Sequence, residues 1–138
     1  MAQGNATDPR ADRLAMAAEA IDAMKGDYIV QLQKNMATLK ATWARVDAKC
    51  PNAADLDYLF DLAHNLKGQA GTFGYDLVTS VAASLCELRG EDRSNPNKMK
   101  AVGQHVSVLE RIVAKNIVGH GGDTGAKIVQ ALQDLSTT

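Results

Sequence analysis

The sequence of 138 residues has few aromatic residues, few prolines and few cysteines. Aromatic residues make up 4% of the chain, and there are three prolines and two cysteines. Because strands are enriched in aromatic and β-branched residues, a 46% hydrophobic fraction with so few aromatics favours helices. Cys50 and Cys86 lack CxxC spacing, which argues against a disulfide framework or a structural zinc site. We expect both to be ordinary small apolar or surface residues.

The sequence also lacks an excess of either charge and any long apolar run. Fifteen basic and sixteen acidic residues leave a formal net charge of −1, too little to hold nucleic acid or an anionic membrane. No run of about 18 apolar residues and no secretory signal occurs, so we expect a cytoplasmic protein. There is no nucleotide-binding motif and no G-x-S-x-G nucleophile elbow, which argues against an ATPase and against a serine hydrolase.

The sequence does contain apolar residues that recur at steps of three and four positions along the chain. The length fits one domain, which we assign to residues 11–138 after a disordered lead-in at residues 1–10. The pattern predicts a short first helix that ends at Gly26, and a long one from Tyr28 to Pro51. Further helices are predicted at about 52–70, 75–88 and 97–118, with a short closing helix after the glycines of 119–122.

Long helices with one apolar stripe each and short connections are typical of an antiparallel bundle. We therefore predict an all-α, up-down four-helix bundle, with its core at about residues 27–118 and short additional helices at both ends.

The most informative stretch runs from His64 to Gly74 and reads HNLKGQAGTFG. On a helix, His64 shares a face with Phe60 and Asp61 before it and with Lys67 and Gly68 after it. The apolar stripe is offset from that face, so His64 should point to solvent. That stripe comprises Leu59, Ala63, Leu66 and Ala70.

This surrounding suits phosphoryl transfer. A neutral imidazole is an adequate nucleophile near neutral pH, and Lys67, one turn on, can attract phosphate oxygens. Gly68 leaves room beside the ring for a second protein. Each glycine inside a helix costs about 0.5–1 kcal/mol relative to alanine, so something other than helix stability selected Gly68 and Gly71, while Gly74 can simply end the helix.

The pattern H-x-L-K-G, then five residues, then Gly74 and another amphipathic helix resembles the phosphotransfer motif of histidine-containing phosphotransfer (HPt) domains. The resemblance covers the second to the fifth predicted helix. It implies that His64 is the phosphoacceptor, Lys67 the phosphoryl-stabilising cation and Gly68 the access residue. Gln69 departs from the family, in which many members have a serine or another small residue there. Asp61, which could orient the ring, Gln69 and Gly71 are supporting candidates.

The resemblance implies a carrier that relays phosphoryl groups between His64 and aspartates of response-regulator receiver domains, including those of a hybrid histidine kinase. We expect a monomer that does not bind ATP or phosphorylate itself, and therefore not an enzyme. It needs no cofactor of its own, because the receiver is expected to bring a divalent metal such as Mg²⁺.

Other interpretations remain open at this stage. A helical adaptor without chemistry is the main alternative, and His64 would then be an ordinary surface histidine. The step from Asp61 to His64 also occurs in di-iron bundles, but these need a second copy that this chain lacks. Phe60 could line an exposed docking rim or belong to the core. His105 and His120 have no matched neighbours and are assigned no function.

Overall fold

The computed structural model describes residues 9–46, 53–90 and 94–137, and these contain helices and turns but no strand. The predicted all-α class is confirmed. By its internal contacts the chain forms two units, residues 1–31 and 32–138. The elements in order are α1 (Pro9–Arg45), α2 (Ala53–Ala70), the 3₁₀ helix η2 (Gly71–Phe73), α3 (Asp76–Cys86), α4 (Pro96–Ala114) and α5 (Gly122–Thr137).

Helix α1 is longer than the sequence suggested, since it runs through Gly26 without a break. The predicted end at this residue is wrong because one glycine costs a helix only about 0.5–1 kcal/mol, which neighbouring good helix formers offset. Residues 1–8 of the predicted lead-in lie outside the described residues, whereas Pro9 and Arg10 already belong to α1. Proline suits a first helical position because its missing N–H would have no partner there.

The first unit contributes only the N-terminal part of α1. Its side chains from Pro9 to Asp27 are all exposed. The exposed ones include the large apolar side chains of Leu14, Met16, Ile21 and Met24. The spacing of Leu14, Ile21 and Met24 correctly predicted a helix here.

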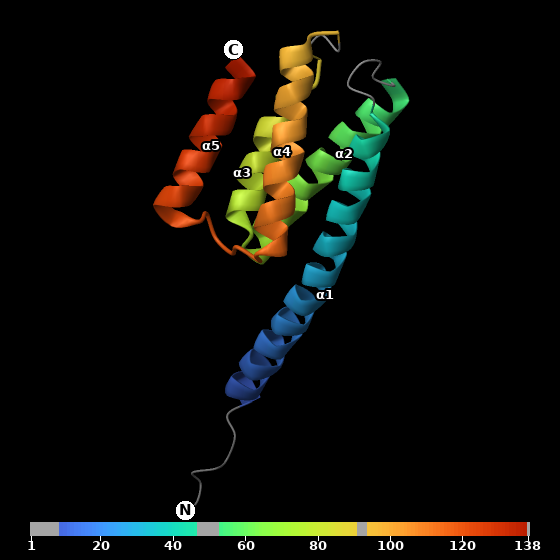
Figure 1. Ribbon diagram of the computed structural model, residues 1–138. Coiled ribbons are helices and arrows are strands. Elements are labelled where there is room, and N and C mark those ends of the chain that lie inside the picture. Colours follow the sequence, from blue (N-terminus) through green and yellow to red (C-terminus); the bar gives the residue numbers. More distant parts are fainter. Residues whose placement is uncertain (1–8, 47–52, 91–93, 138) are drawn as a thin grey trace, which may run out of the picture. The chain divides into compact units, whose positions relative to one another are not determined.

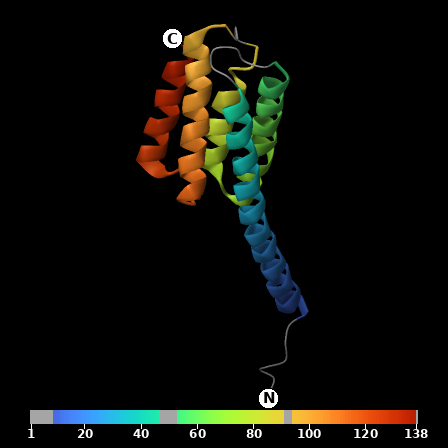
Figure 2. The same cartoon turned by 45° about the vertical axis from the view of Figure 1, so that its right-hand side comes forward.

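The second unit is a helical bundle in which consecutive helices run in opposite directions, as Figures 1 and 2 show. Helix α3 packs against α2, α4 and α5, and α4 also packs against α5. The predicted antiparallel bundle is confirmed. The closing helix α5, at 16 residues, is longer than the 11-residue α3 and lies beside α3 and α4 (Figure 1), so it is not a short appendage. The buried seams include Leu32, Met36 and Leu39 of α1, Leu77, Val78, Val81 and Leu85 of α3, and Met99, Val102, Val106, Leu109, Ile112 and Val113 of α4.

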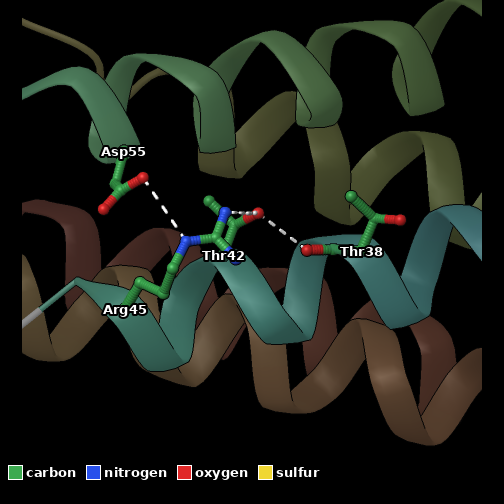
Figure 3. A network of polar contacts seen from close by, with 4 residues as sticks. All are labelled: Thr38, Thr42, Arg45 and Asp55. Carbon is green, nitrogen blue, oxygen red and sulfur yellow. Dashed lines mark hydrogen bonds and ion pairs between the residues drawn. The ribbon is translucent and has the colours of Figure 1, made fainter.

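Polar contacts tie the end of α1 to the start of α2 (Figure 3). Arg45 lies 3.5 Å from Asp55 and donates to Thr42 Oγ1 at 3.3 Å, and that hydroxyl donates to the carbonyl of Thr38 at 2.7 Å. The predicted helix stop at Pro51 lies outside the described residues, as do the cap that we assigned to Asn52 and the isolated Cys50. Helix α1 ends earlier, at Arg45.

The core of the bundle contains one histidine. His105 of α4 is 0% exposed. Its Nδ1 lies 2.6 Å from the carbonyl oxygen of Ala101, and its Nε2 lies 2.8 Å from the hydroxyl of Ser84 in α3. A carbonyl only accepts, so Nδ1 carries the hydrogen, and burial lowers the pKa of His105, which favours the neutral ring in which Nε2 accepts from Ser84. His105 therefore joins two helices as a fully bonded, neutral ring.

No helix in the described part of the chain is long and apolar enough to cross a membrane.

Candidate functional site

Helix α2 presents His64 to solvent, as the spacing predicts. Its inner face is buried against the bundle, through Leu56, Leu59, Phe60, Ala63, Leu66 and Ala70. His64 lies between these positions on the helix surface and is exposed. Within the described part of the chain, neither ring nitrogen of His64 forms a hydrogen bond, so a nitrogen lone pair is available to a reactant.

The helix turn that follows His64 is open. A Cβ atom at Gly68 would meet no heavy atom within 4 Å, so this glycine is not required by a close-packed neighbour. Lys67, one turn after the histidine, is exposed and has no ion-pair partner in the residues that the structure covers. Gln69 is exposed as well. The motif thus combines a free imidazole, a free cation and empty space.

The end of α2 explains two further glycines. A Cβ at Gly71 would lie 3.2 Å from the hydroxyl of Thr79 in α3, so a larger residue would crowd this neighbour. Gly74 has φ +88°, in the left-handed region that glycine tolerates, and its N–H donates to the carbonyl of Gly71. Gly74 therefore ends the 3₁₀ helix η2 that follows α2, whereas the α-helix itself ends four residues earlier, at Ala70. Gly71 therefore lies where the end of α2 packs against α3.

Asp61, one turn before His64, has a partner that helical spacing does not reveal. Its carboxylate lies 2.9 Å from a guanidinium nitrogen of Arg89. Arg89 follows α3, and its guanidinium also lies over the ring of Phe60, 5.9 Å from the centroid. Phe60 is 4% exposed and so belongs to the core, the second of the two alternatives. No contact between Asp61 and the His64 ring is observed in the described residues, so the role of Asp61 in orienting that ring stays a prediction.

The antiparallel pairing of α2 and α3 could have identified Arg89 as the partner of Asp61. In an antiparallel helix pair, residues at equal distances from the connection come to lie side by side. Asp61 and Arg89 are each fourteen residues from Tyr75, where α2 and α3 connect.

Cys86 is the last residue of α3. Burial raises the pKa of its thiol, against smaller opposite effects from the charges of Lys67 and Arg89. Among the residues that the structure describes, no group of three or more histidine, cysteine, aspartate or glutamate side chains could hold a metal ion.

The comparison with family models gives a match to the Hpt domain over residues 23–115. Because the match covers most of the chain, including α2, α3 and α4, the protein belongs to the Hpt family. Hpt domains are phosphocarriers of two-component phosphorelays and interact with response-regulator receiver domains. No match was found among curated proteins.

Proposed function

We propose that this protein accepts a phosphoryl group on His64 and relays it to or from the aspartate of a receiver domain. The observation that carries the proposal is the exposed His64 ring, without a hydrogen bond in the described residues, on a helix that the bundle holds in place. A nucleophile on a rigid helix is oriented without further loss of entropy when the partner docks.

In the forward step, one nitrogen of neutral His64 attacks the phosphorus of an aspartyl phosphate. The P–O bond to the aspartate breaks as the N–P bond forms, and the carboxylate leaves on the partner. Lys67 offers its ammonium group to the phosphoryl oxygens, whose charge must be balanced during transfer. Gly68 leaves space in which the partner's aspartate can reach the ring. Transfer in the reverse direction uses the same groups.

The partners in this proposal are receiver domains, including those of hybrid histidine kinases, and the protein works as a cytoplasmic monomer. The divalent metal, Mg²⁺ in our proposal, comes with the receiver, and the carrier supplies the nucleophile and the cation. The carrier has no autokinase activity. Incubation with labelled ATP alone should therefore leave the protein unlabelled.

The test is a transfer assay against a panel of receivers phosphorylated with radiolabelled phosphate. A phosphocarrier takes an acid-labile, base-stable label from at least one of them. A helical adaptor would bind a receiver but take no label, and this result would overturn the proposal. The His64→Gln variant is the control, because it keeps the surface but removes the nucleophile.

A further inference from the structure

We propose that Arg89 is a second phosphoryl-binding cation of this site, held by Asp61 in the unphosphorylated protein and passed to the phosphoryl group once His64 carries it. The inference rests on the proposed function and adds a switch in ion pairing. Lys67 and Arg89 then flank the phosphorylated ring, with Lys67 one turn after it and Arg89 reaching the turn before it.

The ion pair between Asp61 and Arg89 lies where Arg89 can exchange the Asp61 carboxylate for a phosphoryl group on His64. It joins α2 to the turn after α3, at 2.9 Å, directly before the acceptor histidine. The Arg89 side chain is 45% exposed and that of Asp61 is 62% exposed. Exposed ion pairs are weak, because water and salt screen both charges. Breaking this pair therefore costs little.

The ring of Phe60 keeps Arg89 near the site whichever anion it binds. The guanidinium lies 5.9 Å from the ring centroid, within the range of a cation–π contact. Phe60 itself is buried in the bundle and cannot move away. Because the attraction to an aromatic face does not depend on the anion, this contact can persist while Arg89 changes partners.

A phosphoryl group on His64 is the stronger competitor for Arg89. Side chains three residues apart on a helix have Cβ atoms about 5–6 Å apart, so the Asp61 carboxylate and a phosphoryl group on His64 offer their oxygens to the same neighbourhood. A phosphoryl group offers three acceptor oxygens and about −1.5 to −2 charges, whereas Asp61 offers one charge. Arginine also binds phosphate in a bidentate geometry. The freed Asp61 carboxylate then repels the phosphoryl group and favours its departure.

This model predicts opposite effects for the two members of the pair. Arg89→Ala should shorten the lifetime of phosphorylated His64 by about three- to tenfold, because one charge-assisted contact is lost. Asp61→Asn should lengthen it by about two- to fivefold, because Arg89 is released to the phosphoryl group and the repulsion disappears. Arg89→Lys should restore part of the lifetime, since the charge returns but not the bidentate geometry.

The experiment uses the full chain and phosphoramidate as a small donor, so that receiver docking plays no part. The N–P bond of phosphoramidate breaks, ammonia leaves, and the N–P bond on His64 forms. ³¹P NMR at mildly alkaline pH then follows the decay of phosphohistidine in the wild type, Arg89→Ala, Arg89→Lys and Asp61→Asn. Asp57→Asn is the matched control, because Asp57 is an exposed carboxylate on the same face of α2, two turns before His64, and should leave the lifetime unchanged.

A second readout observes Arg89 directly. The side-chain Nε–H signal of Arg89 should shift on phosphorylation of the wild type, as the guanidinium leaves Asp61 for the phosphoryl group. Thermal melting of each variant checks that the bundle is intact.

The outcomes separate this inference from the proposed function. If the wild type takes phosphoryl but all variants decay at the wild-type rate, or the Arg89 signal stays in place, the switch is overturned while the phosphocarrier function stands. If neither phosphoramidate nor any phosphorylated receiver labels the wild type, the function itself fails. The inference then fails with it.

Discussion

Two histidines of this bundle, one on α2 and one on α4, have opposite environments. His64 on α2 is exposed and forms no hydrogen bond within the described part of the chain. His105 on α4 is fully buried, and both of its ring nitrogens are hydrogen-bonded. In our proposal the imidazole acts as a nucleophile where the fold leaves its lone pair free. In the core the same group is used for structure.

Two glycines beside these histidines differ in the same way. At Gly68, a Cβ would meet no heavy atom within 4 Å. At Gly103 of α4, it would lie 2.7 Å from the indole of Trp43, so this glycine lets α1 approach α4 closely. One glycine keeps an external surface open, and the other allows close packing inside the bundle.

The largest effect that we expect is from His64→Gln. Glutamine is an adequate helix former at this exposed position, so helicity and thermal midpoint should be almost unchanged. Phosphoryl uptake should be abolished because no nucleophilic ring nitrogen remains. Single-turnover labelling by a phosphorylated receiver measures this, and an acid-labile, base-stable label on the variant would mean that another residue is the acceptor.

The next largest effect should come from Gly68→Gln. The new side chain would fill the space that an incoming aspartate needs, so transfer should slow by about 100-fold or more. Because the position is open, stability should hold or rise by up to about 1 kcal/mol. Thermal melting and the transfer assay on the same variant decide between access and packing. A destabilised protein with normal transfer would contradict the access role.

Much of the fold was predictable because the apolar residues recur at helical steps. The stripe of α2, from Leu56 to Ala70, and that of α4, from Met99 to Val113, are buried as the pattern predicted. The continuation of α1 through Gly26 was not predictable from composition, because a glycine can end a helix or lie within one at a cost of about 1 kcal/mol. Surrounding residues decide the outcome.

The site was predictable where it is local in sequence. His64, Lys67 and Gly68 lie within five residues, so helical spacing alone places them on one face. Arg89 could not be found in this way, because it reaches Asp61 through the register of two helices. That register depends on the connection between α2 and α3, which contains η2 and the left-handed Gly74. Likewise, the buried state of His105 depends on packing between α3 and α4, which its sequence neighbours do not reveal.

Of the changes to the core histidine, His105→Ala tests its structural role most directly. The substitution should destabilise the bundle by about 2–3 kcal/mol, because it leaves a cavity and an unpaired Ser84 hydroxyl in the core. Chemical denaturation measures the loss. Adding Ser84→Ala should recover part of it, and transfer per folded molecule should stay near the wild-type rate. A selective loss of transfer would instead place His105 in the function.

A smaller effect is expected from Lys67→Ala. Transfer should slow by about tenfold without being lost, because an exposed cation aids the reaction electrostatically but forms no bond. The effect should shrink at high salt. Single-turnover rates measured at low and high ionic strength check this. Unchanged rates in the alanine variant would make Lys67 an ordinary solvated lysine.

The smallest effect concerns pH and again separates the two histidines. Burial lowers the pKa of His105, although its hydrogen bond with the Ala101 carbonyl and the charge of Glu87 act in the opposite direction. Above the unfolded-state value, about 6.5, both states are neutral at this residue and it adds no pH dependence. Below that value the unfolded chain binds a proton that the native ring resists, so stability should fall with falling pH. The slope from one proton is at most about 1.4 kcal/mol per pH unit and persists down to the lowered native pKa. Denaturant titrations between pH 7.5 and 5 should show this slope in the wild type and in His64→Gln but not in His105→Gln, and an equal slope in all three would show that the core histidine is not its source.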